Sequence, residues 1–191
     1  MSDIKLPKAL ASYAPLGSTA IHEAGHAAMS FLLDRAIKSV SIAPDFDAGS
    51  AGAVHNRPIG SWFRPDIEVT RRVRVATEDE VVIFYAGMET QTAWCQQVAG
   101  CPRDWRRRVA HGASHDERVA ADLAYYVCSS DDEVGAYLNW LRHRTRGQML
   151  HFEFWPMVIG LAEQLLVTPF MKGAEVRRAM QRAALALVTD D

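Results

Sequence analysis

The sequence predicts a mainly α-helical domain with a small β hairpin or sheet, an α+β architecture with most of its core in helices. Apolar residues recur at helical spacing along most of the chain, whereas alternation of polar and apolar residues is clearest in one short stretch near residue 40. The length of 191 residues, with 49% hydrophobic and 23% charged, is typical of one globular domain. We therefore expect a single domain over residues 1–191, with residues 1–17 as a lead-in segment.

A first helix is predicted to begin near residue 19. Small or apolar residues follow one another at helical spacing, at Ile21, Ala24, Ala28, Phe31 and Leu32. Ser18 or Thr19 can cap the start of this helix, because a hydroxyl oxygen accepts a hydrogen bond from the first backbone N–H groups. The Pro-Leu-Gly sequence at residues 15–17 favours a turn before the cap.

The region after this helix is predicted to form the hairpin. Residues 38–43 alternate polar and apolar side chains, which is typical of a half-buried strand. Residues 44–50 have turn composition, and residues 51–55 can return as a second strand. A loop is expected over residues 56–66, in which Trp62 either anchors the loop or lines a groove.

Further helices are predicted from capping signals and apolar stripes. Three sequences place a Ser or Thr three residues before a Glu, and we expect helices to begin there, at Thr77, Ser114 and Ser130. Pro156 favours the start of a further helix, and residues 174–188 predict the last one. Residues 95–111 are rich in arginine and are expected to form a loop.

The predicted first helix contains the sequence His-Glu-x-x-His, at His22, Glu23 and His26. Residues four apart lie on the same face of a helix, so the two imidazoles can bind one metal ion. Glu23 lies about 100° further round, where its carboxylate can reach a water molecule held beside the metal. This is the layout of a zinc peptidase with a glutamate as general base. The simpler alternative is a helix with two histidines that are solvated or satisfied in the core.

Composition argues against several other classes of protein. The net charge of −2 argues against a protein whose main partner is a nucleic acid. Three cysteines, Cys95, Cys101 and Cys128, lack paired CxxC spacing and fit free thiols in a reducing cytoplasm. The N-terminus lacks the pattern of a signal peptide, and no apolar stretch is long enough to span a bilayer. We expect a soluble cytoplasmic protein without nucleic-acid partners or membrane insertion.

Four segments carry a resemblance to a known family: His22-Glu23-Ala24-Gly25-His26-Ala27, Val40-Ser41-Ile42-Ala43-Pro44 with the later Gly52, Ala86-Gly87, and Gly112-Ala113-Ser114-His115-Asp116. Together they resemble the peptidase domain of the FtsH-type membrane AAA proteases. The resemblance covers roughly residues 16–188, and the ATPase module and membrane segments of that family have no counterpart in this sequence.

This resemblance implies a helical, zincin-type metallopeptidase fold and a third zinc ligand at Asp116. A carboxylate in the first turn of a capped helix is well placed to face a neighbouring helix. Two alternatives stay open: Asp116 only complements the helix N-terminus, or His115 is the ligand instead. Four residues after Gly87 the family usually has a glutamate, where this chain has Gln91. That change affects metal affinity if the position supports a ligand through a hydrogen bond.

The resulting hypothesis is a stand-alone zinc metalloendopeptidase that cuts peptides or flexible protein segments without ATP. His22, His26 and Asp116 hold the zinc ion. Glu23 takes a proton from water and later delivers it to the leaving amine.

The substrate is expected to lie extended along the edge strand of the hairpin, near Val40, Ile42 and Gly52. One alternative is a non-catalytic zinc-binding module with a regulatory or assembly role. Another is a metallohydrolase that acts on a non-peptide amide. The sequence does not predict the oligomeric state.

Overall fold

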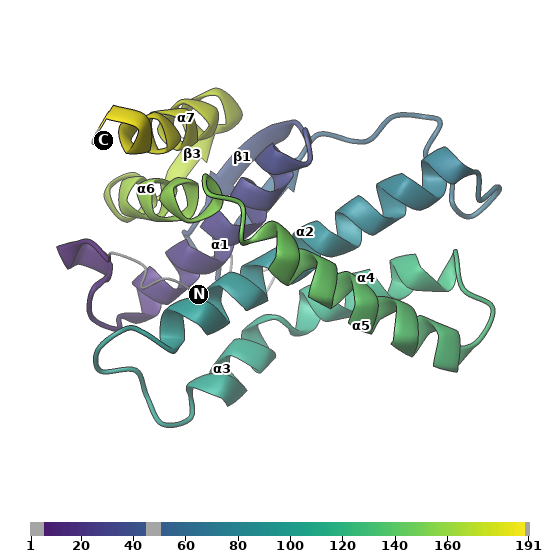
Figure 1. Ribbon diagram of the computed structural model, residues 1–191, viewed down its shortest axis with the longest axis horizontal. Coiled ribbons are helices and arrows are strands. Elements are labelled where there is room, and N and C mark those ends of the chain that lie inside the picture. The colour runs from purple at the N-terminus through teal and green to yellow at the C-terminus, as the bar shows by residue number, and fades with distance from the viewer. Residues whose placement is uncertain (1–5, 45–50, 190–191) are drawn as a thin grey trace.

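Two long helices cross at the centre of the computed structural model, which describes residues 6–44 and 51–189, with side chains through residue 186. These are α1 (Pro15–Leu32) and α2 (Arg71–Cys95), and they pack closely against each other (Figure 1). Every residue of α1 from 20 to 30 is buried. The motif helix is therefore the centre of the hydrophobic core, and its histidines are held by packing on several sides.

The predicted hairpin is present as part of a three-stranded antiparallel sheet. Its strands are β1 (Ile37–Ser41), β2 (Ala53–Asn56) and β3 (Phe170–Lys172), in the order β2-β1-β3. The two predicted strands are confirmed, whereas β3 was not expected, because three residues are too few to show a periodicity. Most of the expected turn, residues 45–50, lies outside the described residues.

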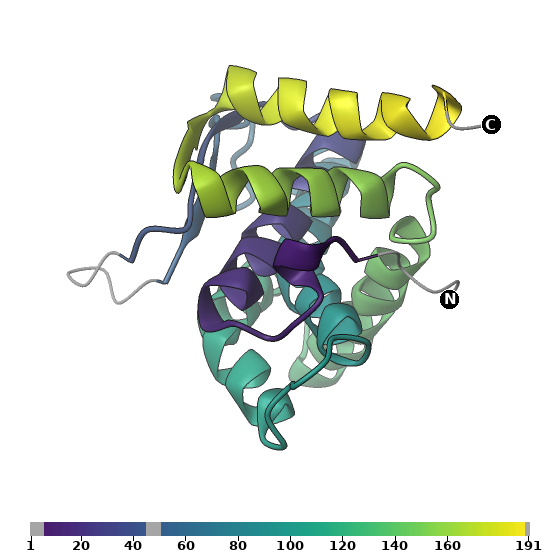
Figure 2. The same cartoon turned by 90° about the vertical axis from the view of Figure 1, so that its left-hand side faces the viewer.

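The last two helices, α6 (Phe154–Val167) and α7 (Gly173–Thr189), are antiparallel neighbours joined through β3 (Figure 2). Both predicted helices are confirmed, although α6 begins two residues before Pro156. α6 packs against α1, so this pair of helices covers the side of α1 that faces away from α2. No helix in the described part of the chain is both long and apolar enough to cross a membrane.

The two central helices begin earlier than predicted. α1 starts at Pro15 with Ala14 as its cap, because a proline in the first turn has no N–H to leave unsatisfied. The expected cap by Ser18 or Thr19 is therefore wrong, and residues 15–17 belong to the helix. Ser18 instead accepts a hydrogen bond from Gln91, with Nε2 and Oγ 2.7 Å apart.

α2 starts at Arg71, where the Thr70 hydroxyl accepts a hydrogen bond from the Val73 N–H at 3.2 Å. The predicted start at Thr77 is wrong. The Thr77 side chain is buried inside the helix and donates to the Val73 carbonyl at 3.0 Å. A hydroxyl that donates to the carbonyl of residue i−4 is compatible with the interior of a helix. The Thr-x-x-Glu sequence at Thr77 therefore does not require a helix start.

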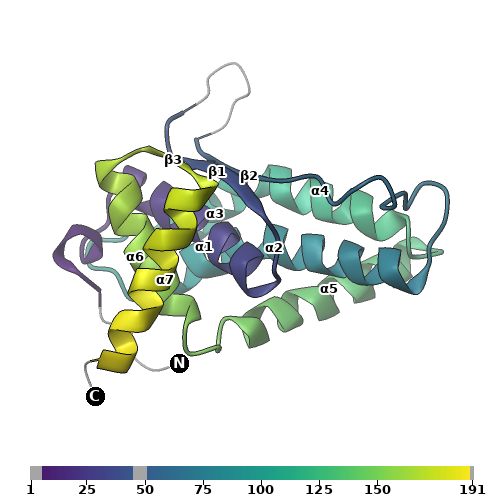
Figure 3. The same cartoon turned by 90° about the horizontal axis from the view of Figure 1, so that it is seen from above.

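Three further helices complete the fold: α3 (Trp105–Gly112), α4 (Ser114–Tyr125) and α5 (Asp131–Gln148). The expected loop over residues 95–111 is thus partly wrong, because α3 occupies its second half. α4 begins at Ser114 as predicted, but no side chain caps it. α5 has the predicted cap, in which the Ser130 hydroxyl accepts from the Glu133 N–H. Seen from above, α2 lies between α4 and α5 (Figure 3).

The described residues thus form seven α-helices and one small antiparallel sheet. The mainly helical, α+β fold class predicted from the sequence is confirmed. What matters for the site is that α1 carries the two histidines at the centre, α2 crosses directly beside them, and α4 brings a carboxylate from a third direction.

Candidate metal centre

Three side chains of types that can bind a metal ion converge, from two helices, at the crossing of α1 and α2. His22 and His26 come from the middle of α1, and Asp116 comes from the first turn of α4. Asp116 Oδ2 lies 3.1 Å from His22 Nε2 and 3.3 Å from His26 Nε2. The two Nε2 atoms are 3.0 Å apart. The three donor atoms therefore surround one point.

The outer nitrogen of each imidazole is held by an oxygen from α2. His26 Nδ1 lies 2.7 Å from the Ile83 carbonyl oxygen, which can only accept, so this nitrogen carries the proton. His22 Nδ1 lies 3.1 Å from Gln91 Oε1. Such a partner fixes the tautomer and leaves the lone pair of Nε2 directed at the point shared with Asp116. Both histidines are thus oriented as metal ligands are.

Two glycines make room for this arrangement. A Cβ added at Gly25 would lie 2.6 Å from the Thr90 hydroxyl and 2.9 Å from the Ala86 carbonyl, so α1 and α2 approach closely there. A Cβ added at Gly87 would lie 2.8 Å from His22 Nε2 and closer still to His26 Nε2. The space that a side chain at Gly87 would fill is the space in front of the two ring nitrogens. The absence of that side chain leaves room there.

The donor set fits zinc. Two imidazole nitrogens and one carboxylate oxygen are a common set of three protein ligands for a catalytic zinc ion, which keeps a fourth position for water. Ligand atoms on a tetrahedral zinc ion with bonds of about 2.0–2.1 Å lie roughly 3.3 Å apart. The three separations in this cluster are 3.0, 3.1 and 3.3 Å. Only small shifts are needed for the cluster to accept the ion.

Without a metal ion, contact between the imidazoles and Asp116 favours a proton on the cluster. Burial lowers the pKa of His26, but the hydrogen bond and charge of Asp116 outweigh it and raise this pKa to about 9. Burial raises the pKa of Asp116, but hydrogen bonds from His22 and His26 bring it well below its usual range. The site thus favours positive charge, whether that charge is a proton or a metal ion.

Glu23 is buried next to the cluster, with only 6% of its surface exposed. Burial raises its pKa, the charges of His22 and His26 act in the opposite direction, and Asp116 raises it further. A Cβ added at Gly52 would lie 2.7 Å from Glu23 Oε1, so the backbone just before β2 lies against this carboxylate. A carboxyl group with a raised pKa in a dry site is suited to accepting and returning a proton.

The structure argues against both alternatives to Asp116 as the third ligand. His115 is exposed, and its Nδ1 lies 2.9 Å from Arg118 Nη2, away from the cluster. Asp116 is the third member of the only group of candidate metal ligands among the described residues. It lies in the first turn of α4, but its Oδ2 faces both imidazoles, so complementing the helix N-terminus does not account for its position.

The expected substrate-binding residues need correction. Val40 and Ile42 are fully buried, and Val40 lies on the central strand, paired with β2 on one side and β3 on the other. The Ile42 N–H donates to the Pro169 carbonyl at 2.8 Å. These two residues therefore cannot pair with a substrate. Within the described residues β2 and β3 are the edge strands, and Gly52, which precedes β2, stays a candidate because it adjoins Glu23.

A network of charged residues, which sequence reasoning missed, ties α4 to its neighbours. The buried carboxylate of Glu89 accepts from Arg142 Nε at 2.6 Å and from Arg146 Nε at 2.7 Å. Arg142 Nη2 also lies 3.5 Å from Glu117, the residue next to Asp116. This bridge from α5 to α2 and α4 helps fix the first turn of α4. No spacing signal connects Arg142 with the motif, because the link is made only by tertiary packing.

Comparisons with known proteins assign no family to this chain. No protein-family model matches the chain, and no curated protein matches it. The resemblance to the FtsH-type peptidases therefore stays a prediction from the motif residues, and the case for a function depends on the site itself.

Proposed function

We propose that this protein is a zinc-dependent metalloendopeptidase with a zincin-type fold, which hydrolyses peptide bonds in peptides or flexible protein segments without ATP. One observation carries the proposal. The donor atoms of His22, His26 and Asp116 face one point at ligand-like separations, with the carboxylate of Glu23 buried beside them. A purely structural zinc site has no use for that fourth side chain.

The chain supplies a fitting place for the ion. His22, His26 and Asp116 would hold zinc, and the Ile83 carbonyl and the Gln91 amide would keep the two imidazoles oriented. A zinc ion bound there would lower the pKa of a water molecule and stabilise negative charge on a carbonyl oxygen.

Glu23 would act as the proton carrier of the reaction. Its carboxylate takes a proton from the attacking water and later returns the proton to the leaving amine. Burial raises the pKa of Glu23, which helps the protonated form persist until the amine leaves. Because Gly52 has no side chain, a substrate backbone can approach this carboxylate without a clash with a Cβ.

The edge strand β2 offers a way to hold the substrate. An extended peptide can add to a sheet edge through main-chain hydrogen bonds, which makes binding largely independent of sequence. β2 begins one residue after Gly52, so a peptide on its outer edge would pass close to Glu23. This mode of binding suits flexible segments, because a folded substrate would have to unfold locally to become extended.

A non-catalytic zinc-binding module with a regulatory or assembly role is the second candidate. Its support is the low exposure of the two histidines, 8% for His22 and 6% for His26. A structural metal site is closed and keeps no open position for water, which fits buried ligands. The burial of Glu23 beside them favours the peptidase.

The test is cleavage of casein, an unstructured protein, by the zinc-loaded protein and two glutamate variants. We expect Glu23→Gln to lower the cleavage rate by about a thousandfold, typical of the loss of a general base, while the zinc content is unchanged. Glu163→Gln, a matched change on α6, should cleave like the wild type. Cleavage by Glu23→Gln at the wild-type rate would contradict the role of Glu23. Zinc binding without cleavage of casein or of a peptide library would favour the non-catalytic module.

A further inference from the structure

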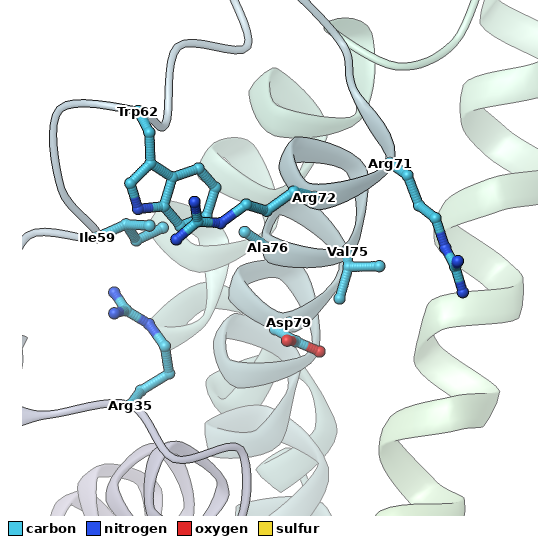
Figure 4. Close-up of a pocket in the computed structure, with 8 residues that line it drawn as sticks. All are labelled: Arg35, Ile59, Trp62, Arg71, Arg72, Val75, Ala76 and Asp79. Carbon is cyan, nitrogen blue, oxygen red and sulfur yellow. The ribbon is translucent and has the colours of Figure 1, made fainter.

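A cavity lies at the N-terminal end of α2, away from the candidate metal centre. This cavity of about 570 Å³ opens between the loop 57–70 and the first turns of α2 (Figure 4). We call it the arginine–tryptophan pocket, after its lining residues, which include Arg35, Ile59, Trp62, Arg71, Arg72 and Val75. It combines an apolar surface with several guanidinium groups, which is the composition of a binding site and not of a packing defect.

The charges around this pocket are only partly balanced. Arg35 is paired with Glu80, with Nε and Oε1 2.6 Å apart. Arg72 stacks on the ring of Trp62, with its guanidinium carbon 3.7 Å from the ring centroid. Across residues 6–44 and 51–186, neither Arg71 nor Arg72 has a carboxylate partner. The one acidic lining residue, Asp79, lies 3.7 Å from Arg144.

The guanidinium groups of Arg71 and Arg72, which lack a carboxylate partner within the described residues, project to different sides of the start of α2: Arg72 reaches over Trp62, and Arg71 points away from it (Figure 4). Arginine binds carboxylates through paired, planar hydrogen bonds, and stacking on Trp62 holds the guanidinium of Arg72 in place before a ligand arrives. Ile59 and Val75 offer contact for aliphatic or aromatic groups. The pocket therefore suits an acidic ligand that also carries apolar groups.

The edge strand connects this pocket with the metal centre. Gly52, just before β2, lies against Glu23. At the other end of β2, the Arg57 carbonyl accepts a hydrogen bond from Arg35 Nη2 at 3.2 Å, and Ile59 already lines the pocket. A strand advances about 3.3 Å per residue, so a peptide along β2 would reach the pocket about seven residues from the one beside Glu23.

We infer that the arginine–tryptophan pocket binds an acidic, partly apolar segment of the peptide substrate, about seven residues from the bond that is cut. This inference rests on the proposed peptidase function. Edge pairing along β2 gives little selectivity by itself, since it uses only main-chain groups. The pocket adds selectivity through side chains and sets the distance between the recognised segment and the cleavage site.

The binding test uses the Glu23→Gln protein, so that a peptide is not consumed. The probe is a fluorescein-labelled peptide with an alternating Glu-Leu segment, compared with the same peptide carrying Gln for Glu. By fluorescence anisotropy, we expect the neutral peptide to bind about tenfold more weakly. Adding Arg71→Gln and Arg72→Gln should weaken binding of the acidic peptide about tenfold and leave the neutral peptide unchanged.

The matched control removes two other exposed arginines. Arg103→Gln with Arg107→Gln makes the same change in net charge near α3, at the opposite end of α2 from the pocket (Figure 1). We expect it to bind both peptides like the parent. Equal binding of the acidic and neutral peptides would overturn the inference, and so would an equal loss in both arginine pairs.

Cleavage by the wild-type protein tests the distance. Moving the Glu-Leu segment by three residues along a longer peptide should move the main cut by three residues, as read by mass spectrometry. A cut that stays in place would overturn the link between pocket and metal centre. If no peptide is cut but the acidic peptide still binds through Arg71 and Arg72, the peptidase proposal fails and the pocket stands. If peptides are cut without preference for acidic segments, only the pocket inference fails.

Discussion

The metal centre and the arginine–tryptophan pocket lie at different points along the same helix and are built in opposite ways. At the candidate metal centre, α2 presents Gly87, the Ile83 carbonyl oxygen and the Gln91 side-chain oxygen to buried histidines, and the helices pack closely around them. At the pocket, the exposed start of α2 presents Arg71 and Arg72 toward solvent beside a loop. Chemistry on a metal requires fixed geometry, whereas recognition of a flexible peptide tolerates mobile side chains on a surface.

The separation of the two sites also has a consequence. Arg71 and Gly87 are 16 residues apart on α2, or about 24 Å at 1.5 Å per residue. Substitutions at one site should therefore leave the other unchanged, because residues this far apart with no shared partners behave independently. At the closely packed candidate metal centre, small changes in side chains should have large effects on zinc binding.

The largest effect is expected for Gly87→Ala. The added Cβ would meet the Nε2 atoms of His22 and His26, so the ring nitrogens could no longer face Asp116 together. We expect zinc affinity to fall by more than the roughly hundredfold that loss of a supporting hydrogen bond causes. Competition with a chromogenic chelator measures this. Peptide binding at the arginine–tryptophan pocket should be unchanged.

The control for this variant is Gly135→Ala on α5, where an added Cβ has no atom within 4 Å. Alanine in an exposed helix stabilises by up to about 1 kcal/mol relative to glycine, so this variant should be slightly more stable and bind zinc normally. If Gly87→Ala bound zinc as tightly as Gly135→Ala, close packing around the ring nitrogens would not be what defines the site.

The next effect concerns pH. Despite burial, contact with Asp116 raises the pKa of His26 to about 9 in the metal-free protein, from an ordinary value of 6.5. Zinc must displace this proton, so its affinity should fall about tenfold for each pH unit below 9. Protonation of His26 also stabilises the metal-free fold: this contribution is complete below pH 6.5 and is lost as the pH rises through 9.

The stabilisation of the fold by zinc depends on the apparent zinc affinity, which rises as the competing proton is lost. The increase in melting temperature on adding zinc to chelator-treated protein should therefore grow between pH 6.5 and 9, which differential scanning calorimetry can follow. A zinc-induced shift that is constant over this range would show that no proton is displaced from the cluster.

The smallest effect is expected at Gln91. Gln91→Leu removes the partner of His22 Nδ1 and should weaken zinc binding about tenfold. Gln91→Glu restores an acceptor with more charge and should bind zinc at least as tightly as the wild type. Gln96→Leu, an exposed change at the end of α2, serves as the control. Zinc affinity is measured by chelator competition. Equal zinc affinity of Gln91→Leu, Gln91→Glu and Gln96→Leu would refute the supporting role of Gln91.

The sequence alone predicted the packed site better than the exposed one. His22, Glu23 and His26 follow one another on a single helix, so their spacing fixes their relative positions before anything else is known. Asp116 lies 90 residues further on, and only the resemblance to a family pointed to it. Of the arginine–tryptophan pocket, only a groove at Trp62 was among the alternatives, because the other lining residues come from the segment after α1, a loop and the start of α2 without a shared pattern.

The errors in the predicted fold have related causes. The start of α2 was misplaced because Thr77 has two possible partners, a backbone N–H as a cap or the Val73 carbonyl within a helix, and only packing decides between them. The role given to Val40 failed because β3, a strand of three residues, turns β1 into a central strand. Ile42, which follows β1, is buried, and its N–H donates to the Pro169 carbonyl. Long periodic elements were predicted well, and features that depend on distant segments were not.

The central claim is that His22, His26 and Asp116 together bind one zinc ion. Its most direct test is the metal content of the protein by mass spectrometry, beside Asp116→Ala and the neighbouring control His115→Ala. The account predicts about one zinc ion per chain in the wild type and in His115→Ala, and almost none in Asp116→Ala. Equal zinc in all three proteins, or no zinc in the wild type after reconstitution, would contradict it.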